Sequence, residues 1–310
     1  MNRSGHLIFI AGPTASGKSS LAVRLAKALH GEIINADALQ VYEPLNLLSA
    51  RPSEEEQEGI SHHLFGTFSG DQSCSAGIWA RLAAPLIDQI LARQHSAIVV
   101  GGTGLYFKAL ETGLSPIPDP GDTVRAIAEA RYEEVGPHAF REEVVANDPA
   151  LDWIEPADRQ RLVRAWSVAH ATGQPLSTFQ AMPAESPLRH KISARIKLIP
   201  PREALYANCE MRFDNMIEQG ALDEAHQIAQ LDLDPALPMM KALGLAELLN
   251  HIHGQISLEE ATALAKRNTR RFAKRQMTWL RGQAQGWPQA ETGEEALRLL
   301  LDQLGGGGRE

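Results

Sequence analysis

The stretch Gly12-Pro13-Thr14-Ala15-Ser16-Gly17-Lys18-Ser19 fits the phosphate-loop pattern G-x-x-x-x-G-K-[ST]. It lies between the apolar run Leu7–Ala11 and an amphipathic run from Ser20 to Leu29, which is the strand and helix context that the pattern requires. The glycines let successive backbone N–H groups point into one concavity that can hold a phosphate chain. Lys18 is expected to reach the outer phosphates, and Ser19 Oγ a magnesium ion (Mg2+). A Gly/Ser-rich turn without a ligand is the alternative, and the flanking elements argue against it.

Strands and helices are predicted to alternate around this motif. The expected strands are Leu7–Ala11, Gly31–Asp37, Ala97–Val100 and Ala194–Ile199. A strand, a phosphate loop, a helix and a second strand open a doubly wound α/β domain, in which ligands gather beyond the carboxyl ends of the strands. We therefore predict a P-loop NTPase-like α/β fold, with a parallel sheet flanked by helices. Asp37 and Thr103 each follow a strand and are expected at the same edge as the phosphate loop.

A second domain is predicted from a change in residue composition and hydrophobic pattern near Glu111. Pro116, Pro118 and Pro120 suggest a hinge-like connection, and residues 123–189 have a helical pattern without a good strand. We predict a core domain over residues 1–112 and 190–310, with C-terminal helices, and an all-helical insertion domain over residues 113–189.

Composition limits the classes of protein that need to be considered. The chain has 310 residues, 44% of them hydrophobic, and no apolar run approaches the length of a membrane span. The first residues run directly into the first strand, so a cytoplasmic protein without a membrane segment is expected. Cys74 and Cys209 are too few for a disulfide framework or a zinc site. The net charge of −8 argues mildly against a protein that coats nucleic acid through its overall field.

Positive charge is nevertheless concentrated in the helix predicted over residues 257–281. Its bases, with no acid among them, are Lys266, Arg267, Arg270, Arg271, Lys274, Arg275 and Arg281. A solvated helix face is one interpretation, and a surface for a polyanion is the other, because neutralising phosphates requires clustered Lys and Arg. A second basic group, Arg159–Arg164, lies in the predicted insertion.

Two further groups of residues could carry chemistry. Asp37 could be a magnesium ligand, a general base or the N-cap of a following helix, and its expected place beside the phosphate loop favours the base. A carboxylate close to a flipped-out purine could take a proton from an exocyclic amine as a new bond forms. His62 and His63 have no third ligand at a metal spacing, so structural hydrogen bonding is expected of them rather than metal binding.

Taken together, these motifs resemble those of the tRNA dimethylallyltransferase family. The matching stretches run in family order to about residue 281: Gly12–Ser19, Ile34–Tyr42, His62–Leu64, Gly101–Tyr106, Asp158–Ala165, Thr172–Ser177, Arg212-Phe213 and Lys274–Arg281. The resemblance implies transfer of a dimethylallyl group from dimethylallyl diphosphate to N6 of the adenosine 3′ to the anticodon. This is nucleotide 37 of tRNAs reading codons that begin with U, and diphosphate is released. It implies Mg2+ as cofactor, the tRNA anticodon stem-loop as partner, and a monomer.

The resemblance also implies roles for individual residues. Gly12–Ser19 would grip the diphosphate, Asp37 would be the general base, and Thr103 and Arg212 would lie near the reacting groups. The residues implied in tRNA binding are Asp37, Ala38, Leu39, Gln40, Thr103, Arg125, Gln160, Arg161, Leu162, Val163, Arg164, Lys241, Gly244, Lys274, Arg275, Gln276 and Arg281. Arg125 would meet either the diphosphate or the RNA.

The chain departs from the family pattern in three places. Ala38-Leu39 stands where Ser-Met is common, which excludes a role that depends on the hydroxyl. Leu48–Pro52 replaces Gly-Thr-Ala-Lys-Pro but retains a base and the proline. In Lys241–Ala246 only Lys241 and Gly244 fit the family pattern.

Other classes of protein share some of these features. A small-molecule kinase would use the same loop for ATP, but its strand would typically end in an acid, whereas Ala97–Val100 is followed by Gly-Gly-Thr. An NTP-dependent RNA-binding switch, without catalysis, would use the same loop and basic helix. An enzyme that prenylates free adenine nucleotides would leave the basic helix and the insertion without a purpose. Whether the loop also binds ATP stays open.

Overall fold

The computed structural model describes residues 5–305 of the chain, which falls into two compact units. Met1–Glu111 and Pro187–Glu310 form one, called here the core unit, and Thr112–Ser186 form the other, the helical unit. Across residues 5–305, no helix combines the length and apolar composition that a membrane span needs.

The core unit contains a six-stranded sheet with the order β3-β2-β4-β1-β5-β6, and every pairing is parallel. The strands are β1 (Leu7–Ala11), β2 (Gly31–Asn35), β3 (His62–His63), β4 (Ser96–Gly101), β5 (Ala194–Leu198) and β6 (Gln289–Ala290). The central strands β1, β2 and β4 are buried along their whole length, as expected of parallel strands covered on both faces. The predicted α/β fold with a parallel sheet is confirmed.

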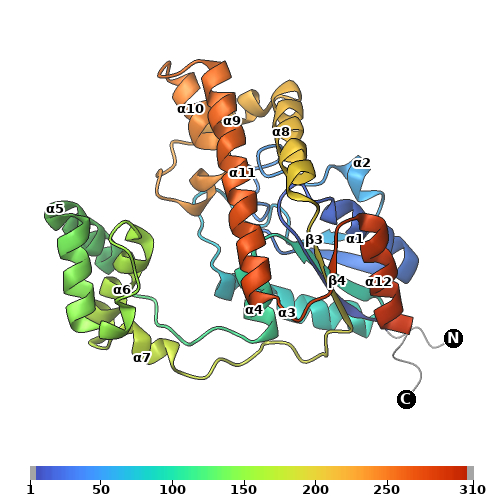
Figure 1. Cartoon of the computed structure of the whole chain (residues 1–310), viewed down its shortest axis with the longest axis horizontal. Coiled ribbons are helices and arrows are strands. Elements are labelled where there is room, and N and C mark those ends of the chain that lie inside the picture. Colours follow the sequence, from blue (N-terminus) through green and yellow to red (C-terminus); the bar gives the residue numbers. More distant parts are fainter. Residues whose placement is uncertain (1–4, 306–310) are drawn as a thin grey trace. The chain divides into compact units, whose positions relative to one another are not determined.

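Helices cover both faces of the sheet. Ile8 and Ile10 pack in one cluster with α1 (Lys18–Leu29) and α12 (Gly293–Gly305), which lie side by side (Figure 1). Phe9 points to the opposite face, because side chains alternate along a strand, and its ring centroid lies 5.4 Å from that of Phe107 in α4 (Gly104–Glu111). Helix α3 (Ala76–Ala92) packs against α4 and β4.

A group of helices follows β5 and reaches the carboxyl edge of the sheet. These are α8 (Arg202–Glu218), α9 (Ala221–Ala229), the short helix η2 (Pro238–Lys241), α10 (Leu245–Ile252) and α11 (Leu258–Gln283). Ser257 and Glu260 form the capping box predicted at the start of α11. Helix α11 packs against α8 and α4, which brings the predicted basic helix to the phosphate-loop edge (Figure 1). A single turn, α2 (Glu54–Gln57), lies between β2 and β3.

The helical unit has its own hydrophobic core. It consists of α5 (Asp122–Asn147), the short helix η1 (Pro149–Leu151), α6 (Arg159–Thr172) and α7 (Leu176–Gln180), and residues 112–186 contain no strand. Helix α5 is interrupted at Gly136, whose φ of 80° is left-handed, directly before Pro137. Tyr132 and Phe140, on either side of this break, pack edge to face at 5.3 Å and close the core against α6.

Candidate active site

Three loops meet at the carboxyl edge of the sheet, after β1, β2 and β4. Gly12 N donates to Gly101 O at 3.2 Å, and Thr103 N donates to Ala36 O at 3.1 Å. Gly101 permits this approach, because a Cβ there would lie 2.0 Å from Ala36 O. The phosphate loop, Asp37 and Thr103 are thus parts of one hydrogen-bonded structure, as their places after adjacent strands predict.

The phosphate loop curls around the N-terminus of α1. Gly17 has a φ of 86° and precedes the first helical residue, Lys18, whose Nζ donates to Pro13 O at 3.2 Å. Ser16 Oγ is buried and has no hydrogen-bond partner in the described part of the chain. A buried hydroxyl without a partner, next to free helix N–H groups, suits an anion such as phosphate.

Two cationic side chains stand at this loop. Burial lowers the pKa of Lys18 to about 8, with Arg212 lowering it further and Asp37 opposing the shift. Burial also lowers the pKa of Arg212, which donates a hydrogen bond to Thr14 Oγ1. The two cations destabilise each other when the loop is empty, so a bound anion would relieve the repulsion.

The oxygens near the loop also suit a hard cation. Ser19 is exposed in the first turn of α1, and Asp37 is half-buried. Hydroxyl and carboxylate oxygens are ligands that Mg2+ accepts beside phosphate oxygens and water. Residues 5–305 contain no group of three or more His, Cys, Asp or Glu side chains placed to hold a metal, so the protein alone would supply only part of the ligand set.

The backbone around Asp37 is held by side-chain hydrogen bonds. Asp37 Oδ1 accepts from Leu39 N at 3.0 Å, and Thr103 Oγ1 accepts from Ala38 N at 2.9 Å. Asp37 is therefore not the N-cap of a helix, since residues 38–41 form turns. Its side chain instead closes a local turn. Asp37 Oδ2 accepts no hydrogen bond from any described residue. One carboxylate oxygen thus anchors the side chain, and the other is left for chemistry.

An open pocket lies beside these groups. Thr14, Asp37 and Arg212 contribute polar groups to its lining, and most of the other lining side chains are apolar. The other lining residues are Leu39, Leu48, Ser49, Cys209, Phe213, Met216, Leu243, Thr269 and Phe272. A pocket lined by one cation, one carboxylate and mainly apolar side chains suits a ligand that has both a charged group and an apolar group.

Gln276, which the resemblance implies in tRNA binding, supports the phosphate loop. The residue is buried, its Oε1 accepts from Thr14 N at 2.8 Å, and its Nε2 donates to Gly102 O at 3.0 Å. Its side chain is therefore engaged with the core unit. Trp279, one turn further along α11, lies against Gly104, where a Cβ would meet the indole at 2.2 Å.

The other residues expected at tRNA in the core unit have mixed surroundings. Lys241, Lys274, Arg275 and Arg281 are exposed, whereas Gly244 is buried against Phe213 with a left-handed φ of 87°. Gln40 donates from Nε2 to Ser49 O and Ala50 O, at 3.0 and 2.8 Å, so it closes the loop that lines the cavity. Ala38 and Leu39 are half-buried beside Asp37.

In the helical unit, the residues predicted to bind tRNA lie at the start of α6 and α5. Gln160 and Arg161 are exposed, whereas Leu162 and Val163 are buried in the unit's core. Arg164 donates to Pro118 O at 3.3 Å, and Arg125 forms ion pairs with Asp119 and Asp122. Any tRNA contact through residues 162–163 would therefore have to use backbone atoms.

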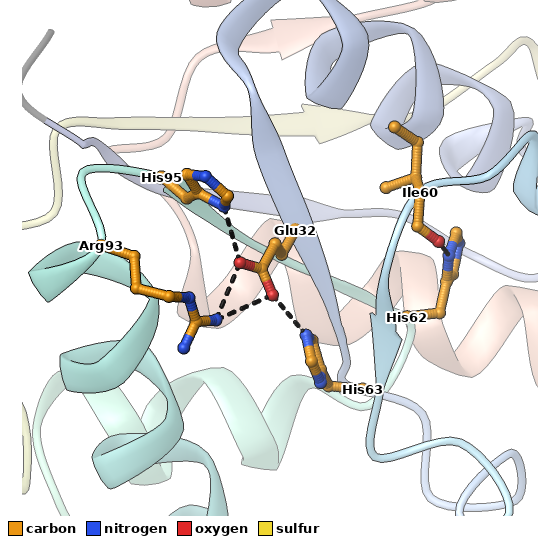
Figure 2. Close-up of polar contacts among 6 residues, drawn as sticks. All are labelled: Glu32, Ile60, His62, His63, Arg93 and His95. Carbon is orange, nitrogen blue, oxygen red and sulfur yellow. Dashed lines mark hydrogen bonds and ion pairs between the residues drawn. The ribbon is translucent and has the colours of Figure 1, made fainter.

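His62 and His63 form structural hydrogen bonds, as predicted from the sequence (Figure 2). His62 Nδ1 pairs with Ile60 O at 2.8 Å, and His63 Nε2 pairs with Glu32 Oε2 at 2.7 Å. Arg93 and His95 bind the same carboxylate of Glu32, which is buried. Burial raises the pKa of Glu32, but the hydrogen bonds from Arg93, His63 and His95 outweigh it and lower the pKa to about 2. The group lies at the amino end of β2, away from the phosphate loop.

Two buried polar residues beside the site were missed from the sequence. Glu224 accepts from Asn46 N, Leu47 N and Leu48 N at 2.8–3.2 Å, which fixes the loop that contributes Leu48 to the cavity. Asn35, fully buried at the end of β2, hydrogen bonds to the backbone of Asp37. An amide two residues before a candidate catalytic acid is a signal that could have indicated Asn35, whereas the link from Glu224 to the loop spans 176 residues or more.

A parallel sheet with a phosphate loop and an acid at its carboxyl edge defines an enzyme with a phosphate-loop fold. The family model described as IPP transferase matches residues 40–283. The tRNA dimethylallyltransferase of Parvibaculum lavamentivorans is 52% identical over 284 residues, covering 91% of this chain and 90% of the relative. That of Phenylobacterium zucineum is 49% identical over 297 residues, covering 95% and 96%.

Solved structures agree with these relatives. The tRNA isopentenylpyrophosphate transferase of Bacillus halodurans has a TM-score of 0.69 at 32% identity, covering 97% of each chain. A eukaryotic dimethylallyltransferase described as acting on tRNA has a TM-score of 0.72 at 27% identity, covering 89% of this chain and 70% of that one. The chain belongs to the IPP transferase family, and the resemblance inferred from its sequence is confirmed.

Proposed function

We propose that this enzyme transfers a dimethylallyl group from dimethylallyl diphosphate to N6 of adenosine 37 in tRNAs that read codons beginning with U, releasing diphosphate. The observation that carries the proposal is the pocket beside the phosphate loop, which is lined by Arg212, Asp37 and mainly apolar side chains. An allylic diphosphate has a matching charged head and hydrocarbon tail. The names of the relatives support the same reaction.

The phosphate loop would hold the diphosphate. Its backbone N–H groups, Lys18 and Arg212 would neutralise the charge that grows on the leaving group as the allylic C–O bond breaks, which is the largest electrostatic contribution expected here. Ser19 Oγ would hold Mg2+, which when bound would supply further positive charge to the diphosphate. The hydrogen bond from Arg212 to Thr14 Oγ1 already places the guanidinium at the loop.

Asp37 would act as the general base. N6 of adenine attacks the allylic carbon, the bonding pair of the C–O bond leaves with diphosphate, and Asp37 accepts a proton from N6. The free Oδ2 suits this task, because Oδ1 is held by Leu39 N at 3.0 Å. Thr103 would support this geometry through Ala38 N, and Gln40 would help to hold the base by shaping its loop.

The anticodon stem-loop would be bound by exposed bases. Lys274, Arg275 and Arg281 on α11 are suited to phosphate contacts, as is Lys241. Arg125 and the start of α6, residues 160–164, would provide contacts from the helical insertion domain, residues 113–189. We further propose that the enzyme is a monomer and acts in the cytoplasm, where tRNA is found.

An assay of released product tests the proposal against its rivals. The enzyme is incubated with Mg2+, unmodified tRNA and either dimethylallyl diphosphate, ATP or GTP, and the tRNA nucleosides are analysed by mass spectrometry. We expect diphosphate release and prenylated adenosine from the allylic donor only. Phosphate release from ATP or GTP without prenylated tRNA would instead identify a kinase or an NTP-dependent switch. In a further incubation with dimethylallyl diphosphate and AMP in place of tRNA, prenylation of AMP at the rate seen with tRNA or above it would displace tRNA as the substrate.

A further inference from the structure

The carboxamide of Asn35 binds the backbone of Asp37 from both sides. Asn35 Oδ1 accepts from Asp37 N at 2.9 Å, and Asn35 Nδ2 donates to Asp37 O at 3.1 Å. The same Nδ2 donates to Leu64 O at 3.0 Å. One side chain therefore fixes both peptide planes that flank the Cα of Asp37 and ties them to the segment after β3.

Asn35 is itself held rigidly. The residue is 0% exposed, and its backbone carbonyl accepts from Trp79 Nε1 at 2.8 Å. The Trp79 ring stacks on Tyr106 with centroids 4.4 Å apart. Asn35 is thus fixed by contacts with α3, with the segment after β3 and, through Trp79, with α4. A residue held in this way can keep the backbone of Asp37 in one position.

The neighbouring hydrogen bonds show why Asp37 needs this support. Residues 36–39 form no regular helix or strand. The repeated backbone hydrogen bonds that would hold a residue within a helix or strand are therefore missing around Asp37. Ala36, Ala38 and Leu39 are each tied by one backbone N–H, to Val100 O, Thr103 Oγ1 and Asp37 Oδ1. Among the described residues, Asn35 is the one whose side chain binds both the N–H and the carbonyl of residue 37.

We propose that Asn35 is a positioning residue, which holds the carboxylate of Asp37 in the orientation needed to accept a proton from the substrate amine. The inference rests on the proposed function, in which Asp37 is the general base. A role limited to satisfying buried backbone groups is the alternative. The two differ because positioning acts only through Asp37, whereas a general structural role would affect the enzyme with or without that carboxylate.

A kinetic double-mutant cycle separates them. We compare wild type, Asn35→Ala, Asp37→Ala and the double variant in single-turnover assays of tRNA prenylation with dimethylallyl diphosphate. Asn35→Ala should lower the rate of the chemical step by roughly 10- to 100-fold, because small misplacements of a reacting group have effects of this size. The KM for the diphosphate should stay within about twofold, since the phosphate loop is untouched. In the Asp37→Ala background, Asn35→Ala should change the residual rate by no more than about twofold.

Two controls keep the test sharp. Ile34→Val removes one methylene from the adjacent buried residue of β2 and should leave turnover unchanged, which measures the effect of mild core loosening. Asn35→Ser retains a hydroxyl that can pair with one backbone group but is too short to bridge both, so it should also lower the rate, and it serves if Asn35→Ala fails to fold.

Three outcomes would overturn the inference. An equal rate loss from Asn35→Ala with and without Asp37, or a wild-type rate in Asn35→Ala and Asn35→Ser, would show that Asn35 does not act through the acid. Wild-type turnover in Asp37→Ala would remove the general base from the proposed function itself, and the inference with it.

Discussion

At the scale of single residues, the site combines two buried cations, whose charged forms are destabilised by burial, with an acid whose orientation is fixed by hydrogen bonds. Lys18 and Arg212 both have pKa values lowered by burial, and they face the phosphate loop where Ser16 Oγ lacks a partner in the described structure. The positive charges of these two side chains are not fully neutralised until an anion binds. Under the proposed function, relief of this repulsion by the bound diphosphate should contribute to the affinity for the allylic donor.

The pKa of Lys18 predicts how donor binding depends on pH. With a pKa of about 8 in the free enzyme, the ammonium form is lost as the pH rises through that value. The KM for dimethylallyl diphosphate should therefore rise by roughly fivefold between pH 8 and pH 9. Lys18→Arg should bind more weakly overall but show a flatter profile, because guanidinium stays charged. Steady-state KM from pH 6.5 to 9.5 checks this (about three pH units around the pKa), and parallel profiles for both enzymes would disprove it.

Which residues could be predicted from sequence depends on how local their interactions are. The phosphate loop, Asp37 and Thr103 follow adjacent strands of one sheet, so topology alone brings them together. Gln276 stands among Lys and Arg in the sequence, yet it lies on the buried face of α11 and binds Thr14, 262 residues away. Its role depends on tertiary packing that the local pattern does not contain.

At the scale of elements, the strongly periodic segments were predicted best. Helices α1 and α11 and the buried strands β1, β4 and β5 lie within a few residues of their expected places, because their apolar spacing matches one period throughout. Strand β6 and helix α12 were not predicted. A strand of two residues has too little sequence to show alternation, and it forms because β5 presents a free edge.

The buried carboxylate of Glu32 in β2, which binds residues of β3 and of the segment before β4, predicts that the fold is sensitive to acid. Glu32 has a pKa of about 2, below its ordinary value of 4.5, because Arg93, His63 and His95 bind its ionised form more strongly than burial opposes it. A carboxyl with a lowered folded-state pKa stabilises the protein above the ordinary pKa, and this contribution, about 3 kcal/mol, is lost as the pH falls from 4.5 towards 2.

Urea unfolding at several pH values checks this contribution. Wild type should lose stability steeply between pH 4.5 and 2, and Glu32→Gln should be less stable at neutral pH with a shallower loss in that window. Glu291→Gln, which changes an exposed acid, serves as the control and should follow wild type. Equal pH dependence in Glu32→Gln and wild type would show that the buried carboxylate does not couple folding to protons.

At the scale of the whole molecule, an acidic chain presents one basic helix. The net charge is −8, but α11 contains exposed Arg267, Arg271, Lys274, Arg275 and Arg281. Two further bases of this helix are already paired, Lys266 with Asp214 and Arg270 with Glu210. Binding of RNA should therefore depend on the exposed subset rather than on the number of bases in the sequence.

Salt dependence of tRNA binding tests this distinction. Replacing Arg271, Lys274 and Arg275 with Gln should weaken binding and reduce the slope of log affinity against log salt by roughly 0.7 to 0.9 for each phosphate that the variant no longer neutralises. The matched control replaces Lys266 and Arg270 with Gln and should leave the slope close to wild type. If both sets reduce the slope equally, the paired bases also meet the RNA and the assignment of the exposed face is wrong.

The central claim is that Asp37 takes the proton from the tRNA base beside a diphosphate held by the phosphate loop. The most direct measurement compares wild type with Asp37→Ala, using unmodified tRNA, dimethylallyl diphosphate and Mg2+, with nucleoside mass analysis for turnover and a binding assay for tRNA. The account predicts that the variant loses most turnover, on the order of 10²–10⁴-fold as for other general bases, while it still binds tRNA. Turnover at the wild-type rate in Asp37→Ala would contradict it.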